Sequence, residues 1–257
     1  MARLLITGGA GLLGLNWALH RRNIDEVRTT LYRRNVVVEG VHSHVVDLGN
    51  AAAVARLIDE VCPEVIVHTA GMTDVDGCQI NPAKSYFENF ETAKILANCC
   101  NESAVKLVHI STDHLSDGAK PLVCETDEIG PLNVYAMHKA DAEKAILNHA
   151  KDALVIRTSF FGWGPEYRRS FSDHVLDNLS NGVPIQMFDD VFFTPISTRR
   201  LIALTHEALD FGLQGVLNIC GHERISKYEF STRLAEAFGY DGEVIQPVQA
   251  FRQRDKT

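Results

Sequence analysis

Short apolar runs alternate along the chain with longer stretches in which apolar residues recur at helical spacing. The apolar runs are rich in Val, Ile and Leu, which is typical of β-strands. They predict strands over 3–7, 27–32, 43–46, 64–68, 105–110, 153–158 and 216–219. The amphipathic stretches predict helices over 12–22, 51–61, 83–102, 133–150, 170–181, 198–211 and 226–238. Strands and helices therefore alternate, as in βαβ units.

Several predicted strands, such as "VIVH" and "KLVHI", are apolar on both faces. Such strands are expected where helices cover both sides of a parallel sheet. The sequence thus predicts the α/β class, with an open, doubly wound parallel sheet and a small C-terminal substrate lobe. Composition changes after Thr158, where "SFFGWGPEYRRSF" brings aromatic residues, glycines and arginines together. We predict a nucleotide-binding domain over 1–160, to which 185–222 returns, and a lobe built from 161–184 and 223–257.

Composition excludes several classes of protein. The chain has 257 residues, 46 % of them hydrophobic and 23 % charged, with a formal net charge of −8. A general nucleic-acid binder needs a basic surface, so this charge argues against one. The six cysteines show no C-x-x-C spacing and are expected to be reduced thiols. Neither a membrane span nor a signal peptide is apparent, and we expect a cytoplasmic protein.

The first predicted strand runs into a glycine-rich turn. In "LLITGGAGLLGLNWALHRR", Gly8, Gly11 and Gly14 stand three residues apart, after a strand and at the start of a helix. Gly8 permits a tight turn, Gly11 lets a pyrophosphate approach the backbone, and Gly14 lets the helix pack close to the strand. The helix N-terminus offers free N–H groups to the phosphates. This context predicts a dinucleotide-binding Rossmann domain rather than a turn without a ligand.

The end of the second strand bears on the choice of cofactor. NAD-binding folds usually place an acidic residue there, about twenty residues past the glycine loop, to hold the ribose 2′-hydroxyl. Here the sequence reads Tyr32-Arg33-Arg34, and the nearest acids are Glu26 and Glu39. Two guanidinium groups suit a 2′-phosphate, so NADP(H) is favoured and NAD(H) is the alternative. In the alternative interpretation, the two arginines are solvated side chains in a surface loop.

Further cofactor contacts are predicted at the ends of the third and fourth strands. Asp47 could meet the adenine or cap the helix that follows it. Thr69, Ala70 and Gly71 are small residues that let the backbone pass close to a cofactor. His68 is expected to be a hydrogen-bonded histidine at a strand end and not a catalyst. The complete set of predicted cofactor contacts is Gly8, Gly11, Leu12, Leu13, Gly14, Arg33, Arg34, Asp47, Leu48, Thr69, Ala70, Gly71, Tyr135, Lys139 and Ser159.

A catalytic group is predicted where the fifth strand ends in "VHISTDH". Ser111 and Thr112 emerge there, at the carboxyl edge of the sheet where ligands bind in this architecture. Tyr135 and Lys139 are one turn apart on the next helix and share a face. Carbonyl reduction needs a hydride donor, a donor to the carbonyl oxygen and an acid. NADPH, Thr112 and Tyr135 would fill these roles in turn.

Lys139 is predicted to acidify Tyr135. Moving a tyrosine pKa from near 10 to about 7 requires roughly 4 kcal/mol. An ammonium about 5 Å away at an effective dielectric constant near 20 supplies on the order of 3 kcal/mol. Lys139 could also hold the nicotinamide ribose hydroxyls. In the alternative interpretation, the pair is a half-buried aromatic residue and a solvated lysine.

These motifs together resemble the extended short-chain dehydrogenase/reductases. "TGGAGLLG", "EVIVHTAG", "ISTD" and "YAMHK" follow the order and spacing of that family, and "HTAGMTDVDGCQINP", "ISTDHLSDG" and "ALVIRTSFFG" look like its dTDP-4-dehydrorhamnose reductase subgroup. The resemblance implies NADPH-dependent reduction of a 4-keto-6-deoxy sugar on a nucleoside diphosphate. It also implies a supporting catalytic role for Asn89 and substrate contacts at Thr112, His114 and Phe160. His114 and Phe160 depart from the subgroup's tyrosine and tryptophan, which leaves the sugar open.

Two alternatives stay open. Sugar-nucleotide dehydratases and epimerases look similar, but the dehydratases need Asp-Glu after the threonine, where this chain has Asp113-His114. The subgroup also resembles the regulatory β subunit of methionine adenosyltransferase, so the chain could bind NADP without turnover. The substrate diphosphate could be met by arginines that are otherwise surface charges, namely Arg168, Arg169, Arg199 and Arg200. A homodimer is an expectation from the family, and no metal site is predicted.

Overall fold

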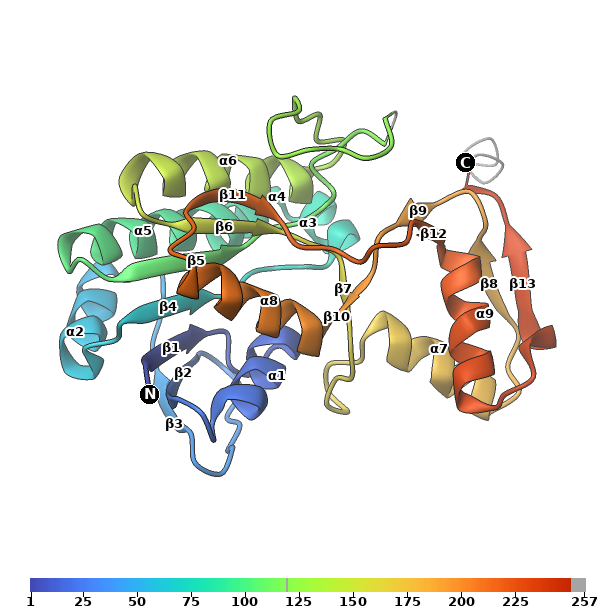
Figure 1. Cartoon of the computed structure of the whole chain (residues 1–257), viewed down its shortest axis with the longest axis horizontal. Helices are drawn as coiled ribbons and strands as arrows, with labels where there is room; N and C mark the ends of the chain where they lie inside the picture. Colours follow the sequence, from blue (N-terminus) through green and yellow to red (C-terminus); the bar gives the residue numbers. More distant parts are fainter. Residues whose placement is uncertain (119, 251–257) are drawn as a thin grey trace. The chain divides into compact units, whose positions relative to one another are not determined.

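The computed structural model describes residues 1–118 and 120–250, and the described chain divides into two compact units. The larger unit comprises Met1–Thr158 and Ile202–Ile219. The smaller unit comprises Ser159–Leu201 and the chain from Cys220 onward. Figure 1 shows the strands and helices of each unit.

The larger unit is built on a parallel sheet of seven strands. They are β1 (Arg3–Thr7), β2 (Glu26–Leu31), β3 (His42–Val45), β4 (Val65–His68), β5 (Lys106–Ile110), β6 (Leu154–Arg157) and β11 (Gly215–Asn218). Their order is β11-β6-β5-β4-β1-β2-β3, and all neighbouring pairs run parallel. The seven predicted strands are confirmed to within one residue at each end. The strand order reverses between β1 and β4, and such a switch point opens a ligand crevice at the carboxyl edge.

Helices cover both faces of this sheet. They are α1 (Leu12–Arg21), α2 (Ala51–Val61), α3 (Val75–Ile80), α4 (Pro82–Tyr86), α5 (Thr92–Glu102), α6 (Val134–His149) and α8 (Thr198–Asp210) from Ile202 onward. On one face, α2, α5 and α6 enclose an apolar core with alternate residues of the central strands. On the other face lie α1 and α8, where the fully buried Trp17 donates a hydrogen bond from Nε1 to His206 Nε2 at 3.1 Å (Figure 1). The predicted α/β class with a doubly wound parallel sheet is confirmed.

The helix predicted over 83–102 has an unexpected interior. It consists of α4, a π-helical turn η1 (Phe87–Glu91) and α5, which follow one another without a break. The spacing of apolar residues in the sequence does not indicate this π-helical turn. The six-residue α3 was not predicted, because "VDGCQI" is short and contains Gly77. Its start is fixed by Asp74, whose side chain accepts a hydrogen bond from Gly77 N at 3.1 Å.

The smaller unit contains two helices and three strand pairs. The helices are α7 (Phe171–Ser180) and α9 (Lys227–Phe238), followed by a 3-10 turn η2 (Gly242–Val244). The pairs are β7 (Phe160–Phe161) with β10 (Ile196–Ser197), β9 (Phe192–Phe193) with β12 (Ile225–Ser226), and β8 (Ile185–Phe188) with β13 (Ile245–Val248). Its core gathers around Phe230, whose ring contacts those of Phe161, Phe171 and Phe193.

The predicted boundaries between the two units need correction. We expected 185–222 to return to the larger domain, but the chain returns at Ile202 and leaves after Ile219. The stretch before Ile202 stays in the smaller unit because it contributes β8, β9 and β10, which all pair within that unit. These strands have two to four residues and carry little periodic pattern.

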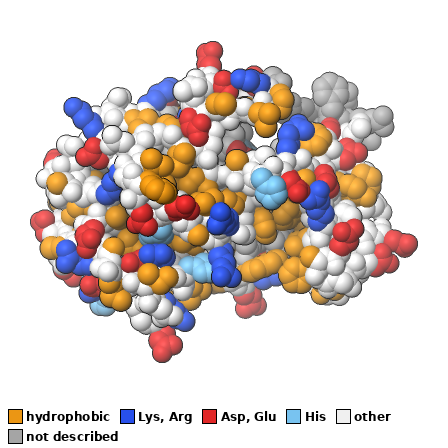
Figure 2. Space-filling view, in the orientation of Figure 1, with side chains coloured by type: hydrophobic (Ala, Val, Ile, Leu, Met, Phe, Trp, Pro, Cys, Tyr) orange, Lys and Arg blue, Asp and Glu red, His pale blue; other side chains and the backbone are white. Residues whose placement is uncertain are grey.

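Lysine, arginine, aspartate and glutamate side chains are interspersed over the face seen in Figure 2. Among the residues that the structure describes, helices long and apolar enough to cross a membrane do not occur.

Candidate active site

The glycine loop closes tightly between β1 and α1. Gly8 has a φ of +73°, a region that side chains rarely adopt. Its carbonyl accepts a hydrogen bond from Gly11 N at 2.8 Å. A Cβ on Gly14 would lie 2.4 Å from the same oxygen, so only glycine fits where the helix meets the turn. The loop therefore has the close-packed geometry that a phosphate cradle requires.

The N-terminus of α1 presents backbone amides without an anion of its own. The N-cap is Gly11, which has no side chain to accept from them, and the first turn reads Leu12-Leu13-Gly14-Leu15. The first N–H groups of a helix have no intrahelical partner, and the helix dipole favours negative charge at this end. These residues fit the pyrophosphate of a dinucleotide.

The turn after β4 presses against this loop. Thr69 Oγ1 donates to Thr7 O at 2.6 Å, and a Cβ on Gly8 would lie 2.9 Å from Ala70 Cα. A Cβ on Gly71 would lie 2.6 Å from Asn89 Oδ1. Small side chains are thus required by packing here. Contact of these residues with a cofactor stays a prediction.

The residues expected to select the cofactor follow β2 directly. Tyr32, Arg33 and Arg34 are all exposed, and the Arg33 guanidinium carbon lies 5.1 Å from the centre of the Tyr32 ring. Of the two nearest acids, Glu26 pairs with Arg28. The other, Glu39, lies five residues beyond Arg34 in the sequence. The site therefore fits a 2′-phosphate better than a bare ribose hydroxyl.

Asp47 does not cap α2. The N-cap is Asn50, whose Oδ1 accepts from Ala53 N at 3.1 Å. Asp47 Oδ1 instead accepts from Gly49 N at 2.9 Å and shapes the turn before the helix. The capping interpretation was therefore wrong, and contact with the adenine stays a prediction, as it does for the partly buried Leu48.

Thr112 and Tyr135 meet just beyond β5. Ser111 N donates to Ile156 O at 2.7 Å, which holds the end of β5 against β6. Thr112 is only 5 % exposed, and its Oγ1 accepts from His114 N at 3.2 Å. The Thr112 hydroxyl lies near enough to the Tyr135 phenol to lower its pKa. Two hydroxyl groups are therefore neighbours at the predicted catalytic position.

The predicted acidification of Tyr135 is not present in this structure. Burial raises the pKa of Tyr135 to about 12, and the Thr112 hydrogen bond, which lowers it, only partly offsets the effect. The negative charge of Asp113 raises it further. Lys139 does not act on the phenol because its ammonium is turned elsewhere. Tyr135 is accordingly a protonated phenol at neutral pH.

The Lys139 ammonium lies beneath β5, completely buried. Its Nζ donates to Ile110 O at 2.7 Å and lies 2.9 Å from His109 Nε2. Burial lowers the pKa of Lys139 to about 8, while the carboxylate of Glu143, one turn further along α6, raises it. The alternative of a solvated lysine is wrong, since this side chain is 5 % exposed.

Asn89 supports the turn after β4. It sits in the π-helical turn η1, and such turns often occur at functional sites. Its Oδ1 accepts from Met72 N and its Nδ2 donates to Met72 O, both at 3.0 Å. It also donates to Ser85 Oγ, which is bonded to His138 Nδ1. Asn89 thus clamps the backbone next to Gly71, and its predicted supporting role in catalysis stays a prediction.

Sequence reasoning missed two groups around Lys139. His109 was treated as part of an apolar strand, although a histidine in "KLVHI" is itself a signal of a polar function. Arg157 forms a bidentate ion pair with Glu143 at 2.8 to 3.1 Å, and both are nearly buried. This pair fixes α6 to the end of β6. Its partners are 14 residues apart, so the spacing gave no hint.

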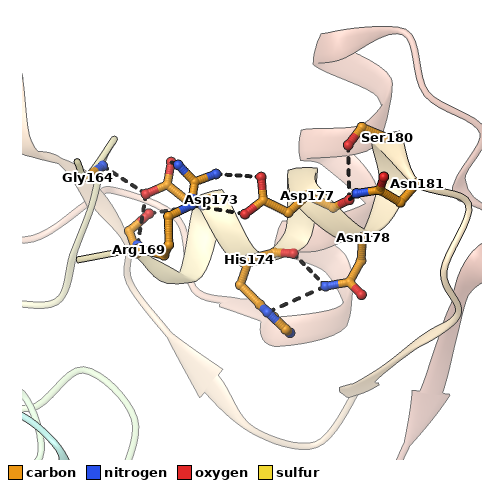
Figure 3. Close-up of polar contacts among 9 residues, drawn as sticks. Gly164, Arg169, Asp173, His174, Asp177, Asn178, Ser180 and Asn181 are labelled. Atoms are coloured by element: carbon orange, nitrogen blue, oxygen red, sulfur yellow. Dashed lines mark hydrogen bonds and ion pairs between the residues drawn. The ribbon is translucent and has the colours of Figure 1, made fainter. Parts of the chain in front are cut away.

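Several predicted residues lie in the smaller unit. Ser159 O accepts from Ile196 N at 3.0 Å, and Phe160 lies in β7. Arg169 pairs with Asp177 and lies near Asp173, as Figure 3 shows. Cofactor or substrate contacts of these residues, of His114 and of Arg168, Arg199 and Arg200 stay predictions.

Comparison with known proteins identifies the family of this chain. The family model described as RmlD substrate binding domain matches residues 2–256. The "Probable low-salt glycan biosynthesis reductase Agl14" of Haloferax volcanii is 29 % identical over 94 % of this chain and 82 % of its own length. The dTDP-4-dehydrorhamnose reductase of Mycobacterium tuberculosis is 30 % identical, covering 96 % and 79 %. The methionine adenosyltransferase 2 subunit beta of Rattus norvegicus is 27 % identical, covering 96 % and 75 %.

Solved structures share the fold. A hypothetical dTDP-4-dehydrorhamnose reductase from Sulfolobus tokodaii has 32 % identity and a TM-score of 0.84, with 96 % of this chain and 85 % of that one covered. The dTDP-4-dehydrorhamnose reductase of Bacillus anthracis, solved with NADP, has 21 % identity and a TM-score of 0.86, covering 98 % and 86 %.

Proposed function

Because the chain belongs to the RmlD substrate binding domain family, we propose that it is an NADP(H)-dependent reductase of a nucleotide-linked keto sugar. The relatives named as dTDP-4-dehydrorhamnose reductases support a 4-keto-6-deoxy sugar as the substrate class. The structure solved with NADP supports the choice of cofactor, and Arg33 and Arg34 favour its phosphorylated form.

The observation that carries this proposal is the pair of neighbouring hydroxyls formed by Thr112 and Tyr135. The pair sits at the carboxyl ends of the strands, on the same sheet edge as the glycine loop. Reduction of a carbonyl requires a proton donor and a polarising donor at one oxygen. A partly buried phenol and a buried threonine hydroxyl supply both.

The protein's part in the reaction follows from these side chains. The bound cofactor supplies the hydride. Thr112 donates a hydrogen bond to the carbonyl oxygen, and Tyr135 transfers its proton to that oxygen as negative charge develops. A raised phenol pKa suits this direction, because the phenol stays protonated and an alkoxide is the stronger base. The buried Lys139, one helical turn from Tyr135, is assigned to the ribose hydroxyls of the cofactor, since its ammonium is held at Ile110 O and His109.

The test is oxidation of NADPH in the presence of nucleotide-linked keto sugars, followed by loss of absorbance. We expect turnover with a dTDP-linked 4-keto-6-deoxy sugar. Tyr135→Phe should abolish turnover and leave NADPH affinity within a factor of about two, because it removes only the phenol hydroxyl that carries the transferred proton. Retained turnover in this variant would exclude the phenol as the acid.

A second function has a specific observation in its favour. Lys139 is bonded to His109 and Ile110 and does not acidify Tyr135, an arrangement that also suits an NADP-binding regulatory subunit without turnover. The similarity to a methionine adenosyltransferase subunit points the same way. NADPH binding without oxidation of NADPH by any keto sugar in the panel would favour this function.

A further inference from the structure

A row of polar side chains crosses the sheet on the face that α5 and α6 cover. Thr7 of β1 stands in register with His68 of β4, and His68 with His109 of β5. Their side chains are 0 %, 1 % and 1 % exposed. Leu5, two residues before Thr7, lies in the core beneath α5 and α6, and alternate strand residues share a face. At its β5 end the row meets Lys139.

The protonation states in this row follow from the hydrogen bonds. A lysine ammonium can only donate, so the contact of 2.9 Å makes His109 Nε2 the acceptor. A neutral imidazole that accepts through Nε2 carries its proton on Nδ1. Burial, followed by the Lys139 charge, holds the pKa of His109 well below its ordinary value. His109 thus remains an acceptor at neutral pH.

The ammonium is only partly satisfied by this arrangement. Of its three N–H bonds, one goes to His109 and one to Ile110 O. Within the described residues these are its hydrogen-bond partners, which leaves one N–H to present to another group. The position of the imidazole therefore decides the direction of the remaining donor.

A histidine at position 109 is unfavourable for the stability of the core. His109 Nδ1 and the neighbouring His68 Nε2 are buried without a partner in the described chain, and the two rings are 5.2 Å apart. Buried unpaired polar atoms cost stability, and an apolar side chain would avoid the loss. What the histidine provides in return is an acceptor for Lys139.

The geometry points to His109 as a positioning residue. We propose that its neutral imidazole anchors the Lys139 ammonium under the end of β5 and fixes the direction in which the third N–H is presented. The inference rests on the proposed function, in which Lys139 holds the cofactor ribose. The anchoring itself is a property of the chain without ligand, so it can be measured without turnover.

The test follows the titration of Lys139 by NMR in the ligand-free protein carrying ¹³C at lysine Cε, with the signal assigned through Lys139→Met. Charged and titratable groups facing the ammonium are Glu143 on α6, His109 on β5 and His68 on β4. His109→Leu removes the acceptor and should lower the Lys139 midpoint by about one pH unit or more. His109→Gln keeps an acceptor at a similar reach and should restore most of the shift.

The matched control is His206→Leu, because the partly buried His206 also accepts through Nε2, there from Trp17. Its variant should leave the Lys139 midpoint unchanged. If His109→Leu does not fold, His109→Asn replaces it, since its shorter side chain cannot reach Nζ. An unchanged midpoint in the variant without the acceptor would overturn the inference. NADP affinity should decline as the pH is raised and Lys139 loses its charge. In the same variant this decline should begin at a lower pH than in the parent.

The two proposals fail separately. If keto sugars are not reduced but the Lys139 midpoint moves as described, His109 anchors the lysine of a nucleotide-binding protein and only the reductase is lost. If the sugars are reduced and the midpoint does not move, the reductase stands and the anchoring is wrong.

Discussion

The N-termini of α1 and α7 have almost the same backbone and opposite chemistry. The N-cap residues Gly11 and Ser170 have φ of −79° and −85° and ψ of 164° and 174°. Three residues further on, α1 has Gly14 and α7 has Asp173. Ser170 Oγ accepts from Asp173 N, while Asp173 Oδ2 accepts from Ser170 N at 2.8 Å. The side chains at the N-cap and three residues later thus decide whether a helix end is capped by the protein itself or leaves its amides open to a ligand.

The difference follows from what occupies the free amides. In α7 the carboxylate of Asp173 also accepts from Gly164 N at 2.8 Å, so it ties the preceding loop to the helix. In α1 the two glycines at the same positions provide neither a side-chain oxygen nor a charge, so we expect a ligand phosphate to accept from these amides. Stability is gained at one end, and binding capacity is kept at the other.

The largest effect is expected when α1 is given its own carboxylate. Gly11→Asp should lower NADP affinity by about 100-fold or more, because a negative charge then stands within a few ångströms of the pyrophosphate. The melting temperature should not fall, since aspartate is a favourable N-cap, although its Cβ would lie 3.1 Å from Gly8 O. Calorimetric titration with NADP and thermal unfolding measure both.

Gly242→Asp is the matched control for this variant. It adds the same charge in η2 of the smaller unit, where a Cβ would have open space around it. Gly11→Ser adds a neutral cap at the same place as the charged variant. Equal affinity losses for serine and aspartate would show that space, and not charge, governs this helix end.

The converse change removes the carboxylate from α7. Asp173→Ala should destabilise the protein by about 2 to 3 kcal/mol, since it leaves the amides of Gly164 and Ser170 without their acceptor. NADP affinity should stay within a factor of about two of the parent. Urea unfolding monitored by tryptophan fluorescence reports on this region, because Trp163 precedes Gly164. An unchanged unfolding midpoint would mean that the cap is not structural.

The N-termini of α1 and α7 differ in how far their chemistry could be predicted from the sequence. Strand, glycine spacing and helix identified the α1 end because each glycine has a separate mechanical reason to be there. The α7 cap follows from Ser170 and Asp173 in the same way, but its bond to Gly164 is made across a loop whose course no periodicity describes.

The same limit applies to the catalytic group. The meeting of Thr112 with Tyr135 was predictable because strand ends share one sheet edge. The direction of the Lys139 side chain was not, because helical spacing fixes where a side chain starts and not which acceptor it finds. The short strands of the smaller unit were missed since strands of two to four residues carry little alternation.

A smaller effect is expected at Arg33, which is predicted to meet the 2′-phosphate of NADP and not the pyrophosphate. Arg33→Ala should weaken NADP binding by about tenfold and leave NAD binding unchanged, because only NADP carries the 2′-phosphate that the guanidinium would meet. Arg34→Ala gives the parallel measurement. The predicted phosphate contact at α1 would be shared by both cofactors, so equal losses for NAD and NADP would remove the assignment of Arg33 to the 2′-phosphate.

The smallest effect is expected one turn beyond the α7 cap. Asp177 also pairs with Arg169, but it accepts from no backbone amide of the loop and is 51 % exposed at its side chain. Exposed ion pairs contribute little, because water and salt screen them. Asp177→Ala should therefore leave the urea midpoint unchanged at both 0.05 M and about 0.5 M salt. Since Asp173 and Asp177 share one helix and one arginine, a loss at Asp177 as large as that at Asp173 would assign the stability of this helix end to the arginine and not to the cap.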